Sequence, residues 1–240
     1  MAQAGPRTQG EPAARRGGDL AARLASGVVM AAAALAVAWI GGTAFSLFWA
    51  GAAAIVLWEW VRLTRGARPA ALWLAAGIVY AVATFAGPAL LRADGEAGFP
   101  AIVFLFAVVW STDVVSYITG RRVGGARLWP AVSPNKTWAG ALGGIAGAVA
   151  AGFAVAEVAG LRHGPVIALA ALLSVASQSG DLLESAIKRR FGVKDASHVI
   201  PGHGGVMDRL DGFIVAAALA AIIGVARGGL MRAGHGLLAW

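Results

Sequence analysis

Long apolar windows run through almost the whole chain, and they constrain its fold more than any other feature of the sequence. They fall near residues 26–41, 43–61, 69–91, 99–120, 138–159, 164–180 and 212–226. A helix needs roughly 20 mostly apolar residues to cross a bilayer. Only 13% of the residues are charged, against about a quarter in soluble domains, which is too little to cover a water-facing surface. The sequence therefore predicts an all-α fold, a polytopic transmembrane helical bundle of about seven spans.

Basic residues are distributed unevenly among the segments that join these windows. The segments after the second and fourth windows are rich in arginine, whereas those after the third and fifth carry one arginine each, Arg92 and Arg162. By the positive-inside rule, the N-terminus and the segments after even-numbered windows face the cytoplasm. The formal charge of +8 then reflects topology signals and contacts with anionic lipid, and no nucleic acid is expected as a partner. We expect a multi-pass protein of the cell (inner or plasma) membrane.

Charged residues are concentrated in the segment 181–211, which holds five acids, five bases and two histidines. In an ordinary connector such charges would only pair with one another in a solvated loop. Their spacing favours a site instead, because polar residues recur at intervals of three and four on one helix face, which must contact protein or water rather than lipid. This stripe consists of Ser174, Ser177, Gln178, Asp181, Glu184, Ser185 and Lys188.

Three parts follow from this distribution. Residues 1–23, with four arginines among Pro, Gly and Gln, predict a disordered basic cytoplasmic tail. Residues 24–98 are predicted to form N-terminal transmembrane helices. Residues 99–240 are predicted to form a catalytic transmembrane domain with cytoplasmic loops 120–137 and 181–211 and a polar active-site cleft on the cytoplasmic side. Within the fifth window, Gly140 and Gly144 have the spacing of a close helix contact.

Two further polar features leave alternatives open. Thr112, Asp113 and Ser116 begin a second stripe in the fourth window, which indicates either a packing contact with a paired carboxylate or part of the site. Glu59 lies between two tryptophans near the end of the second window. An acid there can simply reach water among interfacial aromatic residues, or it can face the protein interior.

The start of the last window combines carboxylates with a tight turn. Asp208 and Asp211 are one helical turn apart, and together with Asp181 they offer the hard oxygen ligands that Mg²⁺ prefers. The turn Pro201-Gly202-His203-Gly204-Gly205 precedes them, and successive amides in such a turn can bind an anion. These features predict a site for phosphoryl or nucleotidyl transfer.

Taken together, these residues resemble the integral-membrane phosphatidate cytidylyltransferases, or CDP-diacylglycerol synthases. The family signature is matched by Ser185-x-Ile187-Lys188-Arg189, Lys194-Asp195-x-Ser197 and Ile200-Pro201-x-His203-Gly204-Gly205-Val206-x-Asp208-Arg209-Leu210-Asp211. The likeness covers about residues 110–213 and includes Ser133-Pro134-x-Lys136-Thr137-Trp138. Two departures are Ala196-Ser197-His198, where the family more often has Ser-Gly, and a shorter chain before Trp110.

The resemblance implies transfer of CMP from CTP to phosphatidic acid in phospholipid biosynthesis, with Mg²⁺ as cofactor and CDP-diacylglycerol and pyrophosphate as products. It implies Asp181 and Asp208 as metal ligands with Asp211 as helper, and Lys188, Lys194 and Arg209 as neutralising groups. His203 and the amides of Gly202, Gly204 and Gly205 would hold pyrophosphate. Further substrate contacts would come from Asp113, Arg121, Arg122, Ser133, Lys136 and Ser185.

The main alternative is a CTP-dependent membrane lipid kinase of the polyprenol or phytol type, which would transfer the γ-phosphate to an alcohol. A transporter is disfavoured, because its polar groups are expected near the midplane, whereas the charges here lie at one end of the predicted spans. The expected partners are CTP, phosphatidic acid and the lipid bilayer. The sequence leaves the oligomeric state open, with a homodimer as one alternative.

Overall fold

The computed structural model describes residues 13–200 and 204–240, which are mostly helical. The α-helices are α1 (Ala13–Ile40), α2 (Gly42–Leu63), α3 (Ala70–Arg92), α4 (Gly98–Val123), α5 (Trp138–Ala159), α6 (His163–Arg190), α7 (Met207–Gly228) and α8 (Ala233–Leu238), with a 3-10 turn at Leu230–Arg232. A short antiparallel hairpin, β1 (Arg127–Trp129) and β2 (Ser133–Thr137), lies between α4 and α5. The predicted helical fold is confirmed, and the hairpin is an addition within the predicted loop 120–137.

Within residues 13–200 and 204–240, six helices, α2 to α7, are long and apolar enough to cross a bilayer, where the windows predicted about seven spans. The difference lies in α1, whose apolar part in the described residues, Gly27–Ile40, is shorter than a bilayer-crossing helix. Residues 1–12 of the predicted disordered tail lie outside the described residues. The rest of that predicted tail, residues 13–23, lies within the range of α1.

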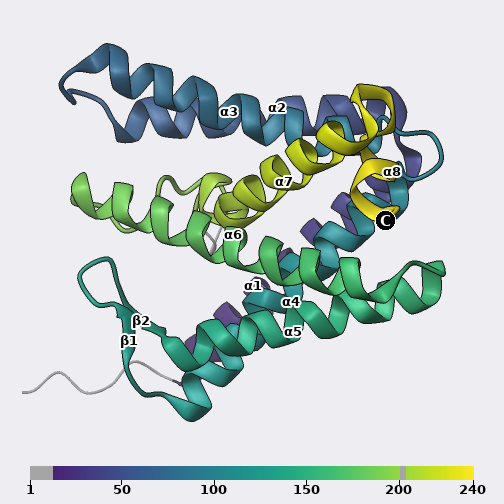
Figure 1. Cartoon of the computed structure of the whole chain (residues 1–240). Helices are drawn as coiled ribbons and strands as arrows, with labels where there is room; N and C mark the ends of the chain where they lie inside the picture. Colours follow the sequence, from purple (N-terminus) through teal and green to yellow (C-terminus); the bar gives the residue numbers. More distant parts are fainter. Residues whose placement is uncertain (1–12, 201–203) are drawn as a thin grey trace, which may run out of the picture.

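The helices pack in an arc (Figure 1). α2 and α3 form a pair, α3 packs on α7, α7 on α6, α6 on α5, and α5 on α4. α8 contacts α7, α4 and α3 at one end of the bundle, here called the α8 end. The turn between α2 and α3, the hairpin and the C-terminal end of α6 lie at the opposite end, here called the hairpin end. The basic segments after α2, α4 and α6 therefore gather at the hairpin end.

Helix α5 approaches α4 closely because glycines face the contact. A Cβ at Gly140 would lie 2.9 Å from the carbonyl oxygen of Ser116, and a Cβ at Gly144 would lie 3.1 Å from that of Thr112. The close contact predicted from the spacing of these glycines is thus confirmed. The amide of Gly140 donates to Thr137 Oγ1 at 3.0 Å, which caps α5. The helix can therefore begin directly after the hairpin.

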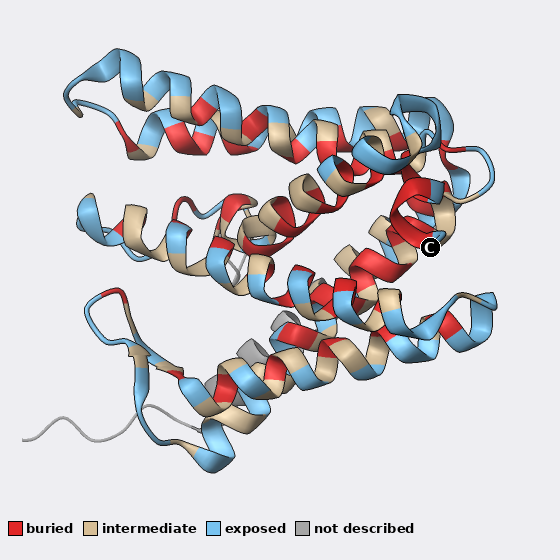
Figure 2. Cartoon of the chain, in the orientation of Figure 1, coloured by how far each residue is buried: buried red, intermediate tan, exposed pale blue. Residues whose placement is uncertain are grey.

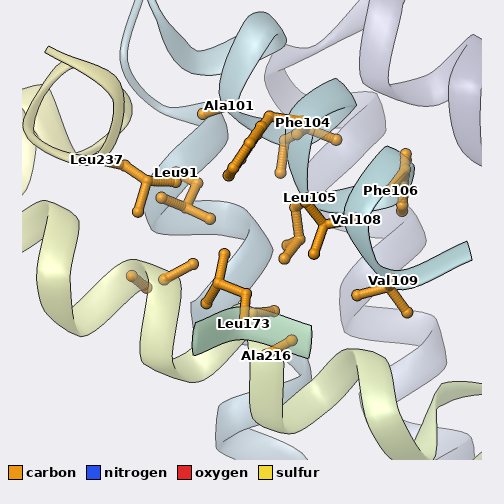
Figure 3. Packing of buried hydrophobic residues seen from close by; sticks show 14 of the residues in the cluster. Leu91, Ala101, Phe104, Leu105, Phe106, Val108, Val109, Leu173, Ala216 and Leu237 are labelled. Carbon is orange, nitrogen blue, oxygen red and sulfur yellow. The ribbon is translucent and has the colours of Figure 1, made fainter. Parts of the chain in front are cut away.

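The main hydrophobic core lies where α4 meets α6, α7 and α8. Figure 2 shows buried residues on the faces that these helices turn toward one another. Figure 3 shows Phe104 and Leu105 of α4 near Leu173 of α6 and Ala216 of α7, all within one buried cluster. Many large apolar side chains on the outer faces, such as Val158, remain exposed. That distribution suits a bundle whose outer surface contacts lipid.

Asp94 ties the α8 end together. It lies in the turn between α3 and α4 and is buried. Its Oδ1 accepts from the amides of Glu96 at 3.1 Å and Ala97 at 3.0 Å, and its Oδ2 accepts from the amide of His235 in α8 at 2.7 Å. Asp94 is therefore a buried carboxylate that holds backbone amides far from the hairpin end.

Candidate active site

A buried ion-pair network lies at the hairpin end, between the last turns of α6 and the first turn of α7. Lys188 Nζ lies 2.9 Å from Glu184 Oε2, one turn earlier in α6, and 2.6 Å from Asp208 Oδ1 in α7. The side chains of Lys188, Glu184 and Asp208 are only 11%, 1% and 5% exposed. The network therefore joins α6 to α7 and brings together two residues predicted to be catalytic.

Asp208 also holds the segment that connects α6 to α7. Its Oδ2 accepts from the amides of Ala196 at 2.9 Å and Gly205 at 2.7 Å, while its Oδ1 accepts from Lys188. Gly204 has a φ of +83°, and a Cβ there would lie 2.9 Å from Asp208 Oδ2. A glycine is needed at that position, because the backbone is left-handed and passes against the carboxylate. Asp208 thus accepts from three donors.

A second ion pair joins the hairpin to α6. Lys136 of β2 pairs with Asp181, and Ser185 Oγ donates to Asp181 Oδ1 at 3.4 Å. Arg189 Nε donates to the carbonyl oxygen of Val132 at 3.4 Å, which fixes the hairpin at another point. The side chains of Lys136 and Asp181 are 28% and 33% exposed. Water screens this pair, so it opens more easily than the buried network around Lys188.

A cavity of about 560 Å³ lies between α1, α2, α4 and α7. Trp49 of α2 and Phe213 of α7 stack in its wall with ring centroids 5.0 Å apart. Asp113, Arg209 and Asp211 also line the cavity, and they are its only charged lining residues among the described ones. A cavity with a mainly apolar lining and a few charged groups suits an amphipathic molecule.

Three carboxylates at this end of the bundle are candidates for holding a metal ion. Asp113, Asp181 and Asp211 lie close enough for their charges to interact. Within residues 13–200 and 204–240, no three His, Asp or Glu side chains are already arranged around one point as metal ligands. Asp208 is engaged with Lys188 and two amides. Because Mg²⁺ needs only one or two carboxylates when phosphates supply further oxygens, Asp181 and Asp211 fit such an ion best.

The sequence is similar to known proteins over most of its length. The model of the cytidylyltransferase family matches residues 71–226. The phosphatidate cytidylyltransferase of Brucella abortus is 39% identical over 86% of this chain and 93% of its own length. The chain belongs to the cytidylyltransferase family. A phosphatidate cytidylyltransferase of Staphylococcus epidermidis is 41% identical over a shorter stretch, 52% of this chain and 49% of its own length.

Among the described residues, the other residues predicted for this cytidylyltransferase belong to neither of these ion pairs. Arg121, at the end of α4, donates from Nη1 to Tyr117 Oη at 2.8 Å. Arg122 and Lys194 are exposed, Ser133 is partly buried in β2, and Gly202 and His203 lie outside the described residues. The structure therefore groups one set of predicted residues closely, namely Lys136, Asp181, Ser185, Lys188, Gly204, Gly205 and Asp208.

Sequence reasoning left one buried acid undecided and gave another no separate role. Glu59 is fully buried and accepts hydrogen bonds from the segment before α7 and from the first residue of α7, so it faces the protein interior. Glu184 is four residues before Lys188, and that helical spacing alone could have predicted their pair. No periodic pattern in this sequence connects Glu59 with donors so far along the chain.

Proposed function

We propose that this protein transfers CMP from CTP to phosphatidate, which forms CDP-diacylglycerol and pyrophosphate. The observation that carries the proposal is the cavity between α1, α2, α4 and α7. Its apolar lining suits the hydrocarbon of a lipid, and Arg209 in the same lining suits an anionic head group. The first turns of α7 supply Arg209 and Asp211 to the cavity and Asp208 to the buried ion pair, so a lipid phosphate bound there would lie beside groups that can hold a nucleotide.

The chemistry demands little from the protein beyond positioning and charge neutralisation. Phosphatidate is anionic at neutral pH, so its phosphate oxygen can attack the α-phosphorus of CTP without a strong base. A new P–O bond to the lipid phosphate forms, the bond from the α-phosphorus to the oxygen bridging to the β-phosphate breaks, and pyrophosphate leaves with that electron pair. Lys136, Lys188 and Arg209 would neutralise the phosphates during this transfer. Lys136 is the readiest to exchange its carboxylate partner for a phosphate, because its pair is partly exposed.

Mg²⁺ is part of the proposal, with Asp181 and Asp211 as ligands, and Asp208 as a ligand if one of its donors is displaced. When bound, Mg²⁺ neutralises charge on the triphosphate. Asp181→Asn keeps the side-chain shape and removes the charge, so we expect kcat to fall about 100-fold or more while the protein still folds. Glu157→Gln, at an exposed pair with His163, is the matched control. Near-normal turnover of Asp181→Asn at limiting Mg²⁺ would remove Asp181 from the ligand set.

The hairpin end is proposed to face the cytoplasm, where CTP is available. The support is the arginine content of the segments after α2 and α4, both of which lie at this end (Figure 1). Reporter fusions at Gly66, Gly125 and Val193 should report the cytoplasm, and a fusion at Gly95 should report the exterior. An external report at Val193 together with a cytoplasmic one at Gly95 would reverse the orientation.

The decisive experiment incubates the purified protein with phosphatidate, Mg²⁺ and CTP labelled at either the α- or the γ-phosphate. CMP transfer puts the α-label into the lipid and the γ-label into pyrophosphate. A lipid kinase instead puts the γ-label into the lipid and needs an alcohol acceptor. Absence of α-labelled lipid would refute the proposal. Light scattering of the same preparation distinguishes a monomer from a homodimer.

A further inference from the structure

Glu59 of α2 contacts the start of α7 across a large sequence separation. Its Oε1 accepts from Ser197 Oγ at 2.5 Å and from the amide of Val206 at 2.9 Å, and its Oε2 accepts from the amide of Met207 at 2.6 Å. Val206 is the N-cap residue of α7, and its own side chain forms no capping hydrogen bond. The first amides of a helix need acceptors, and a carboxylate there also interacts favourably with the helix dipole. Glu59 therefore caps α7 from a different helix.

The surroundings of Glu59 fix its carboxylate closely. Val56 and Trp60 of α2 form a buried apolar cluster with Met207, which keeps water away from the carboxylate. A Cβ at Gly205 would lie only 2.8 Å from Glu59 Cδ. The segment before α7 can approach Glu59 this closely only because position 205 has no side chain. The hydrophobic cluster and Gly205 thus both allow the Glu59 carboxylate to contact the segment before α7.

Glu59 and Asp208 hold the same segment from two sides. The segment connects α6 to α7, and its described residues near each end, called its flanks, show the same pattern. On each flank, one residue donates its amide to Asp208 and the next residue donates a hydrogen bond to Glu59. These consecutive pairs are Ala196 and Ser197 on the first flank, and Gly205 and Val206 on the second. The flanks are also joined to each other, because the amide of Ile200 donates to the carbonyl oxygen of Gly204 at 2.9 Å. A shift of Glu59 would therefore move the donors that fix Asp208.

We propose that Glu59 is a positioning residue for the active site. It acts through the N-terminus of α7 and the two flanks of the preceding segment, and it thereby sets the positions of Asp208 and its partner Lys188. This inference rests on the proposed cytidylyl transfer, for which those two groups must lie correctly beside the phosphates. Misplacement by about 1 Å can lower a rate about 100-fold even when the altered residue is remote from the chemistry.

The test compares Glu59→Ala, Glu59→Gln and Ser197→Ala in the full chain in one detergent. For Glu59→Ala we expect kcat to fall about 100-fold. For Glu59→Gln we expect roughly a 10-fold loss, because the amide keeps one acceptor oxygen but turns an N–H group toward the amide of Met207. The KM for phosphatidate should change less than about twofold, because the cavity wall is retained. Hydrogen exchange should rise in residues 195–200 and 204–210. If Glu59→Ala does not fold, Glu59→Gln and Ser197→Ala carry the test.

Asp94→Asn is the matched control, because Asp94 is also a buried carboxylate with three backbone donors, but at the α8 end. It should lose thermal stability and show faster exchange in residues 233–240, with wild-type kcat and KM. If Glu59→Gln also kept wild-type kcat and KM per folded molecule, Glu59 would be a structural cap only and the inference would be wrong. A wild-type protein without cytidylyl transfer would refute the proposed function, while the exchange data would still decide whether Glu59 holds the segment.

Discussion

Removal of the Lys188 ammonium should destabilise the protein strongly, because it leaves a buried carboxylate without its counter-charge. Glu184 is 1% exposed, and its oxygens accept no hydrogen bond of good geometry from the described residues, so the ion pair at 2.9 Å is its main compensation. Asp208 would keep the amides of Ala196 and Gly205. Breaking a buried ion pair from one side typically costs about 3–5 kcal/mol. For a chain of this size, we expect Lys188→Met to lower Tm by roughly 6–20 °C.

A second substitution makes this reasoning specific. Glu184→Gln alone leaves Lys188 paired with Asp208, so its effect should be small. In the double variant Glu184→Gln with Lys188→Met, the uncompensated charge is gone, and part of the lost stability should return. Thermal unfolding in matched detergent, followed through the fluorescence of the 9 tryptophans, measures all four proteins of this cycle. A double variant as unstable as Lys188→Met, or less stable, would refute the argument.

Three further predictions follow from other contacts. Lys136→Arg should lower kcat almost as much as Lys136→Ala in the labelled-CTP assay, because a planar guanidinium keeps the charge but cannot take the position of a compact ammonium beside a phosphate. Gly144→Leu should lower Tm by several degrees, because even a Cβ there would lie 3.1 Å from the carbonyl oxygen of Thr112. Burial tends to raise the pKa of Asp94, but amide donors outweigh it and lower that pKa. The stability that Asp94 provides is therefore present above about pH 4 and is lost as the pH falls through the lowered pKa, so the Tm difference between the wild type and Asp94→Asn should shrink in acid.

The hydropathy windows predicted the bounds of the helices well where a helix is apolar to its ends. They predicted the bounds less well where a helix has a polar end. The fourth window, 99–120, and the fifth, 138–159, match α4 and α5 closely. The sixth window ends at 180, but α6 continues to Arg190, and α7 begins at Met207 rather than at 212. Hydropathy detects the transfer of side chains into lipid, whereas a helix continues wherever its backbone hydrogen bonds and caps are satisfied. The candidate site lies at the polar ends of α6 and α7, so the sixth and seventh apolar windows do not include it.

The candidate site was predictable where its contacts are local. The spacing of Asp181, Ser185 and Lys188 places them on one face of a helix, where the structure has Lys188 buried and the other two partly exposed. The pair between Lys136 and Asp181 joins a hairpin to a helix, and no periodicity predicts such a contact. The same limit applies to Glu59, because a contact between distant helices depends on how the whole bundle packs.

The role of Glu59 also bears on how the chain divides into parts. The family model matches residues 71–226, so Glu59 lies before the matched stretch. Asp208 accepts from the amide of Gly205, but Val206, the N-cap residue of α7, has no side chain that could accept from the first amides of the helix. The missing acceptor comes from α2, and the same helix lines the cavity beside the ion pairs. The helices of residues 24–98 are therefore more than a membrane anchor for a separate catalytic half, because the first turn of α7 takes its cap from them.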